Sequence, residues 1–88
     1  MKEISSEKVI QILNDNIENA DITWENIEED LTSLGMDSLG FVKIIVFLEE
    51  EFECEIPDTK LLISEMNTAQ KIIDVLKILY ESTHVYEQ

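Results

Sequence analysis

The sequence is poor in the residues from which many metal and catalytic sites are built. Its 88 residues include one cysteine, one histidine, one proline and two glycines, and all six basic residues are lysines. The lone Cys54 cannot form an internal disulfide, and no cysteine and histidine spacing typical of a zinc site is present. No metal site is therefore predicted, and the fold is expected to depend on packing alone.

Positive charge and long apolar runs are also scarce. Six basic residues against twenty acidic ones give a formal net charge of −14. This charge repels nucleic acid and anionic lipid, whereas a basic protein surface would be attracted. The longest apolar run, Ile44–Leu48, is far shorter than the roughly 20 residues of a membrane span, and the N-terminus has no apolar signal core. We expect a soluble, monomeric, cytoplasmic protein that binds neither nucleic acid nor membrane.

The chain is short and has no internal joint. No repeat, low-complexity tract or linker interrupts it, which predicts a single domain over residues 1–88. At this size folding buries only about two-thirds of the unfolded surface, enough for one modest core but not for an enclosed active site. Large catalytic architectures are therefore excluded, and the protein is not expected to be an enzyme.

Apolar residues recur with helical spacing in three segments, which predicts helices over residues 5–18, 39–52 and 69–80 and a short helical turn over 60–64. No segment alternates with period two over the length of a strand. The predicted fold is all-α, a small bundle of three main helices plus one short helix, with a long loop between the first two. Residues with N-cap chemistry precede these helices: Ser5 or Ser6, Asp37 or Ser38, Asp58 or Thr59, and Thr68.

Two further predictions concern which side chains form the core. The apolar residues of the long loop are expected to pack into the core: Ile22, Trp24, Ile27, Leu31 and Leu34. A helical wheel of residues 39–52 directs one set of side chains inward and another outward. The inward set is Val42, Ile45 and Phe52, with Ile44 mostly buried; the outward set is Gly40, Lys43 and Phe47, with Leu39 and Val46 on the flank.

The most informative stretch is Leu34-Gly35-Met36-Asp37-Ser38-Leu39. Gly35 permits a sharp approach to the helix, and Ser38 falls in its first turn, where the hydroxyl can project outward. A phosphodiester on this oxygen would lie at the positive end of the helix, which stabilises it by about 0.3–1 kcal/mol. An unmodified cap remains the simpler alternative. A hydrolase is excluded, since the G-x-S-x-G motif is absent and His84 lies near the chain end.

Three segments in order carry a resemblance to a known family: Leu31 to Leu39, the acidic stretch with Phe52, and Ile56-Pro57-Asp58. Over nearly its whole length the chain resembles acyl carrier proteins. The resemblance implies that Ser38 bears 4′-phosphopantetheine, transferred from coenzyme A by a phosphopantetheinyl transferase, with Asp37 and Leu39 as its neighbours at the site. Asp37 either caps the helix or helps to position the transferase's metal and coenzyme A. The partners implied are acyl- or aminoacyl-loading and condensing enzymes, which perform the catalysis.

The predicted helix over 39–52 departs from the carriers of fatty acid synthesis, which have acidic residues where this chain has Gly40 and Lys43. The expected docking face is therefore apolar with one cation: Leu39, Gly40, Lys43, Val46, Phe47, Glu49 and Glu50. We predict a specialised pathway, such as polyketide or nonribosomal peptide assembly or another dedicated acyl pathway, with primary fatty acid synthesis as the alternative. An acidic adaptor for a basic protein is the alternative outside the carriers.

Two features near the end of this helix have several interpretations. Cys54 is expected to fill a half-buried position as a small apolar residue. The acidic side chains between Glu49 and Glu55 form a solvated face, a patch read by a partner, or a loose divalent-cation site.

Overall fold

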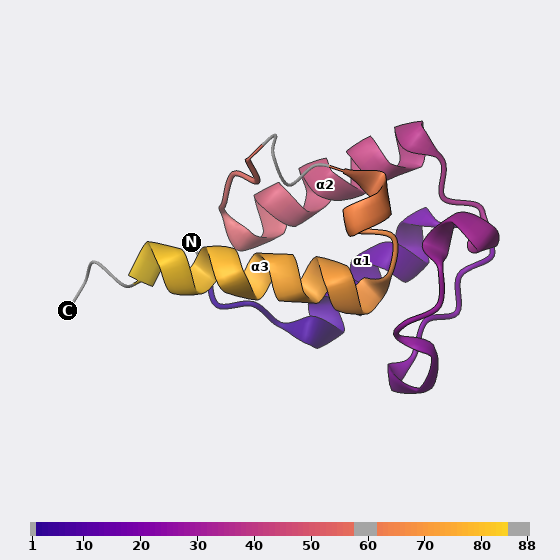
Figure 1. Cartoon of the computed structure of the whole chain (residues 1–88), viewed down its shortest axis with the longest axis horizontal. Helices are drawn as coiled ribbons and strands as arrows, with labels where there is room; N and C mark the ends of the chain where they lie inside the picture. Colours follow the sequence, from indigo (N-terminus) through magenta and orange to yellow (C-terminus); the bar gives the residue numbers. More distant parts are fainter. Residues whose placement is uncertain (1, 58–61, 85–88) are drawn as a thin grey trace.

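Three α-helices and three short 3₁₀ turns make up the part of the chain described by the structure, a computed structural model covering residues 2–57 and 62–84. The helices are α1 (Ser6–Asn16), α2 (Ser38–Phe52) and α3 (Ala69–His84) (Figure 1). The 3₁₀ turns are η1 (Trp24–Asn26), η2 (Leu31–Leu34) and η4 (Ile63–Glu65). The described residues contain no strand, and the predicted all-α bundle is confirmed.

The helix ends differ modestly from the prediction. Ser5 caps α1 by accepting a hydrogen bond from the Lys8 N–H, and α1 is shorter at both ends than the predicted 5–18. Thr68 accepts from the Lys71 N–H at the start of α3, which extends past the predicted end at Tyr80. The predicted caps Asp58 and Thr59 lie outside the described residues, as does part of the predicted turn over 60–64; η4 occupies the described part.

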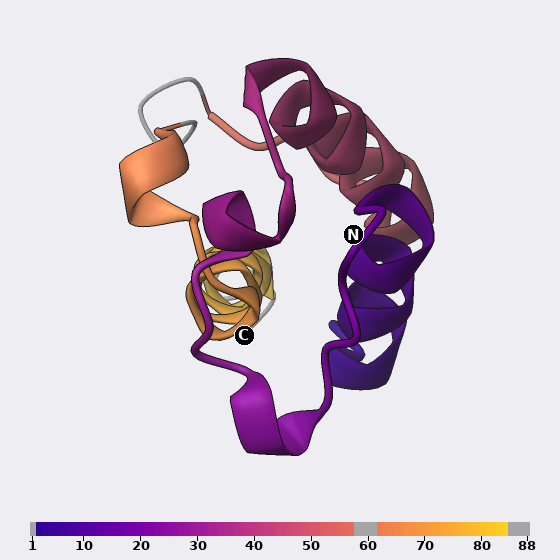
Figure 2. The ribbon, with the colours of Figure 1, turned by 90° about the vertical axis from the view of Figure 1, so that its right-hand side faces the viewer.

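The long loop encloses one end of the bundle. α1 packs against both α2 and α3. η2 covers the end at which α2 and α3 begin, and η1 extends from the same end on the side away from α2 (Figures 1 and 2). Two backbone hydrogen bonds join the loop to the start of α3 and to the segment just before it, from Gln70 N–H to Ile27 O at 3.0 Å and from Leu31 N–H to Asn67 O at 2.7 Å. The loop is therefore an integral part of the fold.

The described ends of the chain lie at the other end of the bundle (Figure 1). Here the Lys2 N–H donates to the carbonyl oxygen of Phe52 at 2.8 Å, and the Lys2 ammonium lies 3.2 Å from the Glu53 carboxylate. The start of the chain is thus tied to the C-terminal end of α2, opposite the end at which Ser38 begins the helix.

One apolar core joins the three helices and the loop, and none of the described helices is long and apolar enough to cross a membrane. Burial of Ile44, Ile45 and Phe52 in α2 is confirmed. The core residues are Val9, Leu13, Ile17, Ile22, Leu31, Met36, Phe41, Ile44, Ile45, Leu48, Phe52, Ile56, Met66, Ala69, Ile72, Ile73 and Leu76.

The predicted orientation of Val42 was wrong, because its side chain is 58% exposed and Phe41 is buried in its place. From Phe41 to Leu48 the only polar residue is Lys43. A wheel with so little polar contrast allows the inward direction to rotate, and the contacts with α1 and the loop decide it. The stripe that faces inward is therefore centred on Ile44, Ile45 and Leu48.

Trp24 was also predicted wrongly as a core residue, because it is 60% exposed. Ile22 fills the core position instead, and Asn14 holds it there by accepting from its N–H at 2.7 Å and donating to its carbonyl at 3.1 Å. A capping box between Thr23 and Asn26 then turns the chain away from the core. Of the other predicted loop residues, Leu31 is buried and Ile27 and Leu34 are half-buried.

Candidate functional site

The backbone that leads into α2 is fixed by Gly35 and Asp37. Gly35 ends η2 in the left-handed conformation, at φ 108°, which favours glycine because a side chain would be strained there. Two residues later the Asp37 carboxylate accepts a hydrogen bond from the Gly40 N–H at 2.7 Å, which makes Asp37 the N-cap. The turn thus places Ser38 as the first residue of α2.

Gly40 packs against the Asp37 cap, although the helical wheel predicted that it points outward. It is half-buried, and a Cβ atom at this position would lie 3.2 Å from the Asp37 carboxylate oxygen. A larger residue at position 40 would therefore press on the atom that caps the helix. The predicted outward position of Gly40 is therefore corrected: the residue is half-buried beside the cap.

The Ser38 side chain is exposed at the positive end of α2. Because Asp37 supplies the cap, the Ser38 hydroxyl is not needed to start the helix. The first N–H groups of a helix have no partner within it, so they favour an anionic group bonded to a side chain at this position. The arrangement suits a phosphate ester on the Ser38 oxygen.

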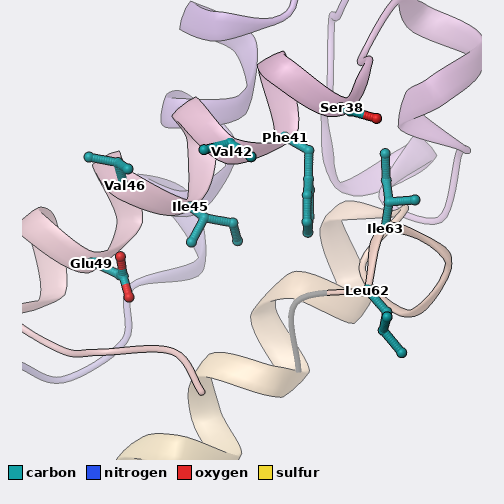
Figure 3. A pocket seen from close by; sticks show the side chains of 8 residues that line it. All are labelled: Ser38, Phe41, Val42, Ile45, Val46, Glu49, Leu62 and Ile63. Atoms are coloured by element: carbon teal, nitrogen blue, oxygen red, sulfur yellow. The ribbon is translucent and has the colours of Figure 1, made fainter. Parts of the chain in front are cut away.

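An apolar cleft of about 440 Å³ starts at Ser38 and runs along α2 (Figure 3). One wall is α2, and the other is formed by Leu62 and Ile63. The Phe41 ring points between the two walls, and Glu49 lies at the far end from Ser38. The lining residues are Ser38, Phe41, Val42, Ile45, Val46, Glu49, Leu62 and Ile63. Ser38 therefore stands next to space suited to an apolar group.

Of these lining residues, only Ser38, Val46 and Glu49 were among the predicted site residues. Val42 could have been found from its spacing of four residues after Ser38, which places both on one helical face. Leu62 and Ile63 follow Pro57 in a segment too short to show a periodic pattern, so the sequence carried no signal for them. Ile44 is fully buried, as predicted, but does not line the cleft.

Glu49 does not belong to an open acidic face. It is half-buried, and its carboxylate accepts a hydrogen bond from the Ile56 N–H at 2.8 Å. This bond turns the side chain of Glu49, a predicted docking residue, toward the segment that follows α2. Glu50 is exposed, as expected.

The remaining predicted docking residues lie on the surface of α2. Leu39 is 77% exposed, and Lys43, Val46 and Phe47 are exposed as well. Lys43 is the only charged residue from Ser38 to Leu48. The surface beside Ser38 is therefore apolar with one positive charge, although the chain as a whole is strongly acidic.

Neither Cys54 nor the acidic residues around it form a reactive site. Cys54 is half-buried, as predicted, and its burial, with a smaller contribution from the nearby Glu49 charge, raises the pKa of its thiol. The thiol is protonated at neutral pH and hence a poor nucleophile. Within residues 2–57 and 62–84, no three histidine, cysteine, aspartate or glutamate side chains are grouped to hold a metal ion. The side chain of His84 lies outside the described part.

The Asp37 cap gives a test of the local geometry. We expect Asp37→Ala to lower the free energy of unfolding by about 0.5–2 kcal/mol, because the Gly40 N–H loses its partner. Asp37→Asn should retain most of the stability, since an amide oxygen also caps helices. Urea denaturation of the three proteins measures the difference. Equal stability of the alanine variant and the wild type would show that the cap does not contribute.

Comparison with known families indicates which chemical group the chain carries. A family model described as a phosphopantetheine attachment site matches residues 7–76, well over half of the chain. The match begins in the first turn of α1 and ends within α3, so it includes the turn at Gly35, the start of α2 and the cleft. No solved structure matches the chain.

Proposed function

The chain belongs to the phosphopantetheine attachment family, and we propose that Ser38 is the residue to which the group is bonded. The family establishes a carrier protein with covalently bound 4′-phosphopantetheine. The observation that supports Ser38 is its exposed hydroxyl at the positive end of α2, where Asp37 and not Ser38 caps the helix. The residues at this position fit a phosphodiester, because nothing in the described structure covers the hydroxyl. We treat residues 1–88 as one carrier domain.

Attachment requires a partner enzyme. The Ser38 oxygen forms a bond to the phosphorus of the phosphopantetheine portion of coenzyme A, and the nucleotide portion leaves. The serine proton must be accepted by another group. The neighbouring Asp37 carboxylate caps α2 through one oxygen, and we assign the role of base to a group of the phosphopantetheinyl transferase. We propose that the second oxygen of Asp37 contacts the metal and coenzyme A of that enzyme.

Once attached, the group supplies a thiol that holds cargo as a thioester. Carrier domains are normally not catalytic, and this chain has no enclosed active site in the described part; its role is to present the thioester to loading and condensing enzymes. Leu39, Lys43, Val46 and Phe47 are exposed on α2, from the residue next to Ser38 to two turns beyond it, and form the proposed docking face. Family membership argues against the cofactor-free adaptor.

The proposed pathway is based on the charge of this docking face. Carriers of primary fatty acid synthesis resemble one another in having acidic residues where this chain has Gly40 and Lys43, and their partners read those acids with basic groups. Lys43 would weaken the binding of such basic partners, and the apolar side chains of the face would favour partners with an apolar surface. We therefore favour a polyketide, nonribosomal peptide or other dedicated acyl pathway, with primary fatty acid synthesis as the alternative.

Two experiments test this function. Incubation with coenzyme A and a broad-specificity phosphopantetheinyl transferase should raise the intact mass by a single phosphopantetheine. The holo-protein should then be a poor substrate for a malonyl transferase of fatty acid synthesis. Lys43→Glu should improve that transfer, whereas Lys77→Glu on α3 changes the net charge equally and should not. Efficient transfer to the wild type would instead support primary fatty acid synthesis.

A further inference from the structure

The only tryptophan of the chain is on the surface. Trp24 opens η1, and its side chain is 60% exposed. An exposed indole is not needed for the core, since Ile22 fills the adjacent position. Hydrogen bonds hold the backbone on either side of it: the Thr23 N–H donates to the Asn26 side chain at 2.6 Å, and the Asn26 amide donates to the Asp21 carbonyl at 3.1 Å.

The segment that contains Trp24 carries negative charge and no positive charge of its own. From Val9 to Val42 the chain has eight acidic residues and no basic one. Glu25, Glu28 and Glu29 are exposed within five residues of Trp24. The Asp30 carboxylate accepts hydrogen bonds from the backbone N–H and the hydroxyl of Thr32, in η2, and these bonds lower its pKa. The nearby charge of Lys71, in α3, also contributes to lowering the pKa of Asp30. We therefore do not count Asp30 among the freely exposed carboxylates. We call Trp24 with Glu25, Glu28 and Glu29 the Trp24 surface.

An exposed indole followed along the chain by exposed carboxylates has a defined complement. A guanidinium or ammonium group is attracted to the face of an indole and to neighbouring carboxylates at the same time. Nucleic acid and anionic membranes are repelled by these carboxylates. A second copy of the chain is repelled as well, since each copy carries a charge of −14. Charge complementarity thus selects one occupant, a basic segment of another protein.

We infer that the Trp24 surface is a second docking surface, which binds an arginine- or lysine-bearing segment of a partner protein. It differs in chemistry from the docking face on α2, which is apolar and carries Lys43. η1 and the start of α2 lie at the same end of the molecule but on opposite sides of it (Figures 1 and 2). A partner approaching this end can therefore reach the Trp24 surface while the attachment point stays accessible.

Calorimetric titration with an acetylated hexa-arginine peptide tests the inference on the full chain without any cofactor. We expect Trp24→Ala to raise the dissociation constant roughly two- to fivefold, since one exposed cation–π contact is lost. Trp24→Phe, which keeps an aromatic face, should lie between Trp24→Ala and the wild type. Circular dichroism confirms that each variant folds.

A pair of charge variants separates this surface from the general negative charge. The loop triple variant Glu25→Gln, Glu28→Gln, Glu29→Gln and the control Glu50→Gln, Glu55→Gln, Glu81→Gln reduce the net charge equally, and all six residues are exposed. The loop variant should weaken peptide binding more than the control does. Wild-type affinity in Trp24→Ala, or equal weakening by both triple variants, would overturn the inference. Because no phosphopantetheine is present, either result is independent of Ser38.

Discussion

The Ser38→Ala variant should show no increase in intact mass after incubation with coenzyme A and a phosphopantetheinyl transferase, whereas the wild type gains a single increment. Loss of the hydroxyl removes the oxygen that forms the phosphodiester, so the expected effect is complete. The variant should still fold, because Asp37 caps α2 and alanine is favourable in the first turn of a helix. Far-ultraviolet circular dichroism of both proteins checks this point.

Ser33→Ala is the matched control for that experiment. Ser33 is also an exposed serine, and it lies in η2 on the approach to the same helix, where its hydroxyl donates to the Asp30 carbonyl at 2.6 Å. This variant should be labelled like the wild type. Labelling of Ser38→Ala, or loss of labelling only in Ser33→Ala, would place the attachment on a different residue and contradict the proposal.

The Leu48→Ala variant should lose about 2–5 kcal/mol of unfolding free energy. Leu48 is fully buried in α2, and its removal leaves a cavity in the one core that joins the helices and the loop. Small domains have a total stability of roughly 5–15 kcal/mol, so this loss is a large fraction of the whole. Urea denaturation, analysed for the midpoint and the slope, measures it.

Val42→Ala provides the comparison for Leu48→Ala on the same helix. Val42 is largely exposed, and alanine has the higher helix propensity, so we expect a change below about 0.5 kcal/mol. A large destabilisation by Val42→Ala would mean that α2 faces the core as the helical wheel predicted. Val42→Ala thus distinguishes the two orientations of the helix, and Leu48→Ala gives the effect expected of a fully buried position.

The sequence was sufficient for the helices because each one combines a cap with apolar spacing. Ser5, Asp37 and Thr68 all cap helices as their chemistry predicts. It was insufficient where apolar residues were too many or too isolated. The uniformly apolar α2 left its rotation undetermined, which misplaced Val42. An isolated Trp24 in a polar loop looks like a core residue. The bonds of Asn14 and Asn26 hold the backbone of Ile22 and Thr23 just before it, and the sequence pattern does not reveal them.

The candidate site also has a part that the sequence predicts and a part that it does not. Ser38 and Asp37 could be identified because their roles depend on neighbours along the chain, namely the turn at Gly35 and the first helical turn. The cleft could not, because its second wall comes from Leu62 and Ile63, distant in sequence. The hydrogen bond of Glu49 could not be predicted for a related reason, since its partner Ile56 lies beyond the end of the helix.

The tie between Lys2 and the end of α2 has a practical consequence for how the protein can be handled. The described ends of the chain leave the molecule at the end opposite Ser38 (Figure 1). We therefore expect that a purification tag, a fluorophore or a solid support joined to either terminus leaves the attachment serine, the cleft and the Trp24 surface accessible. Immobilised in this way, the carrier should still present its thioester to enzymes in solution.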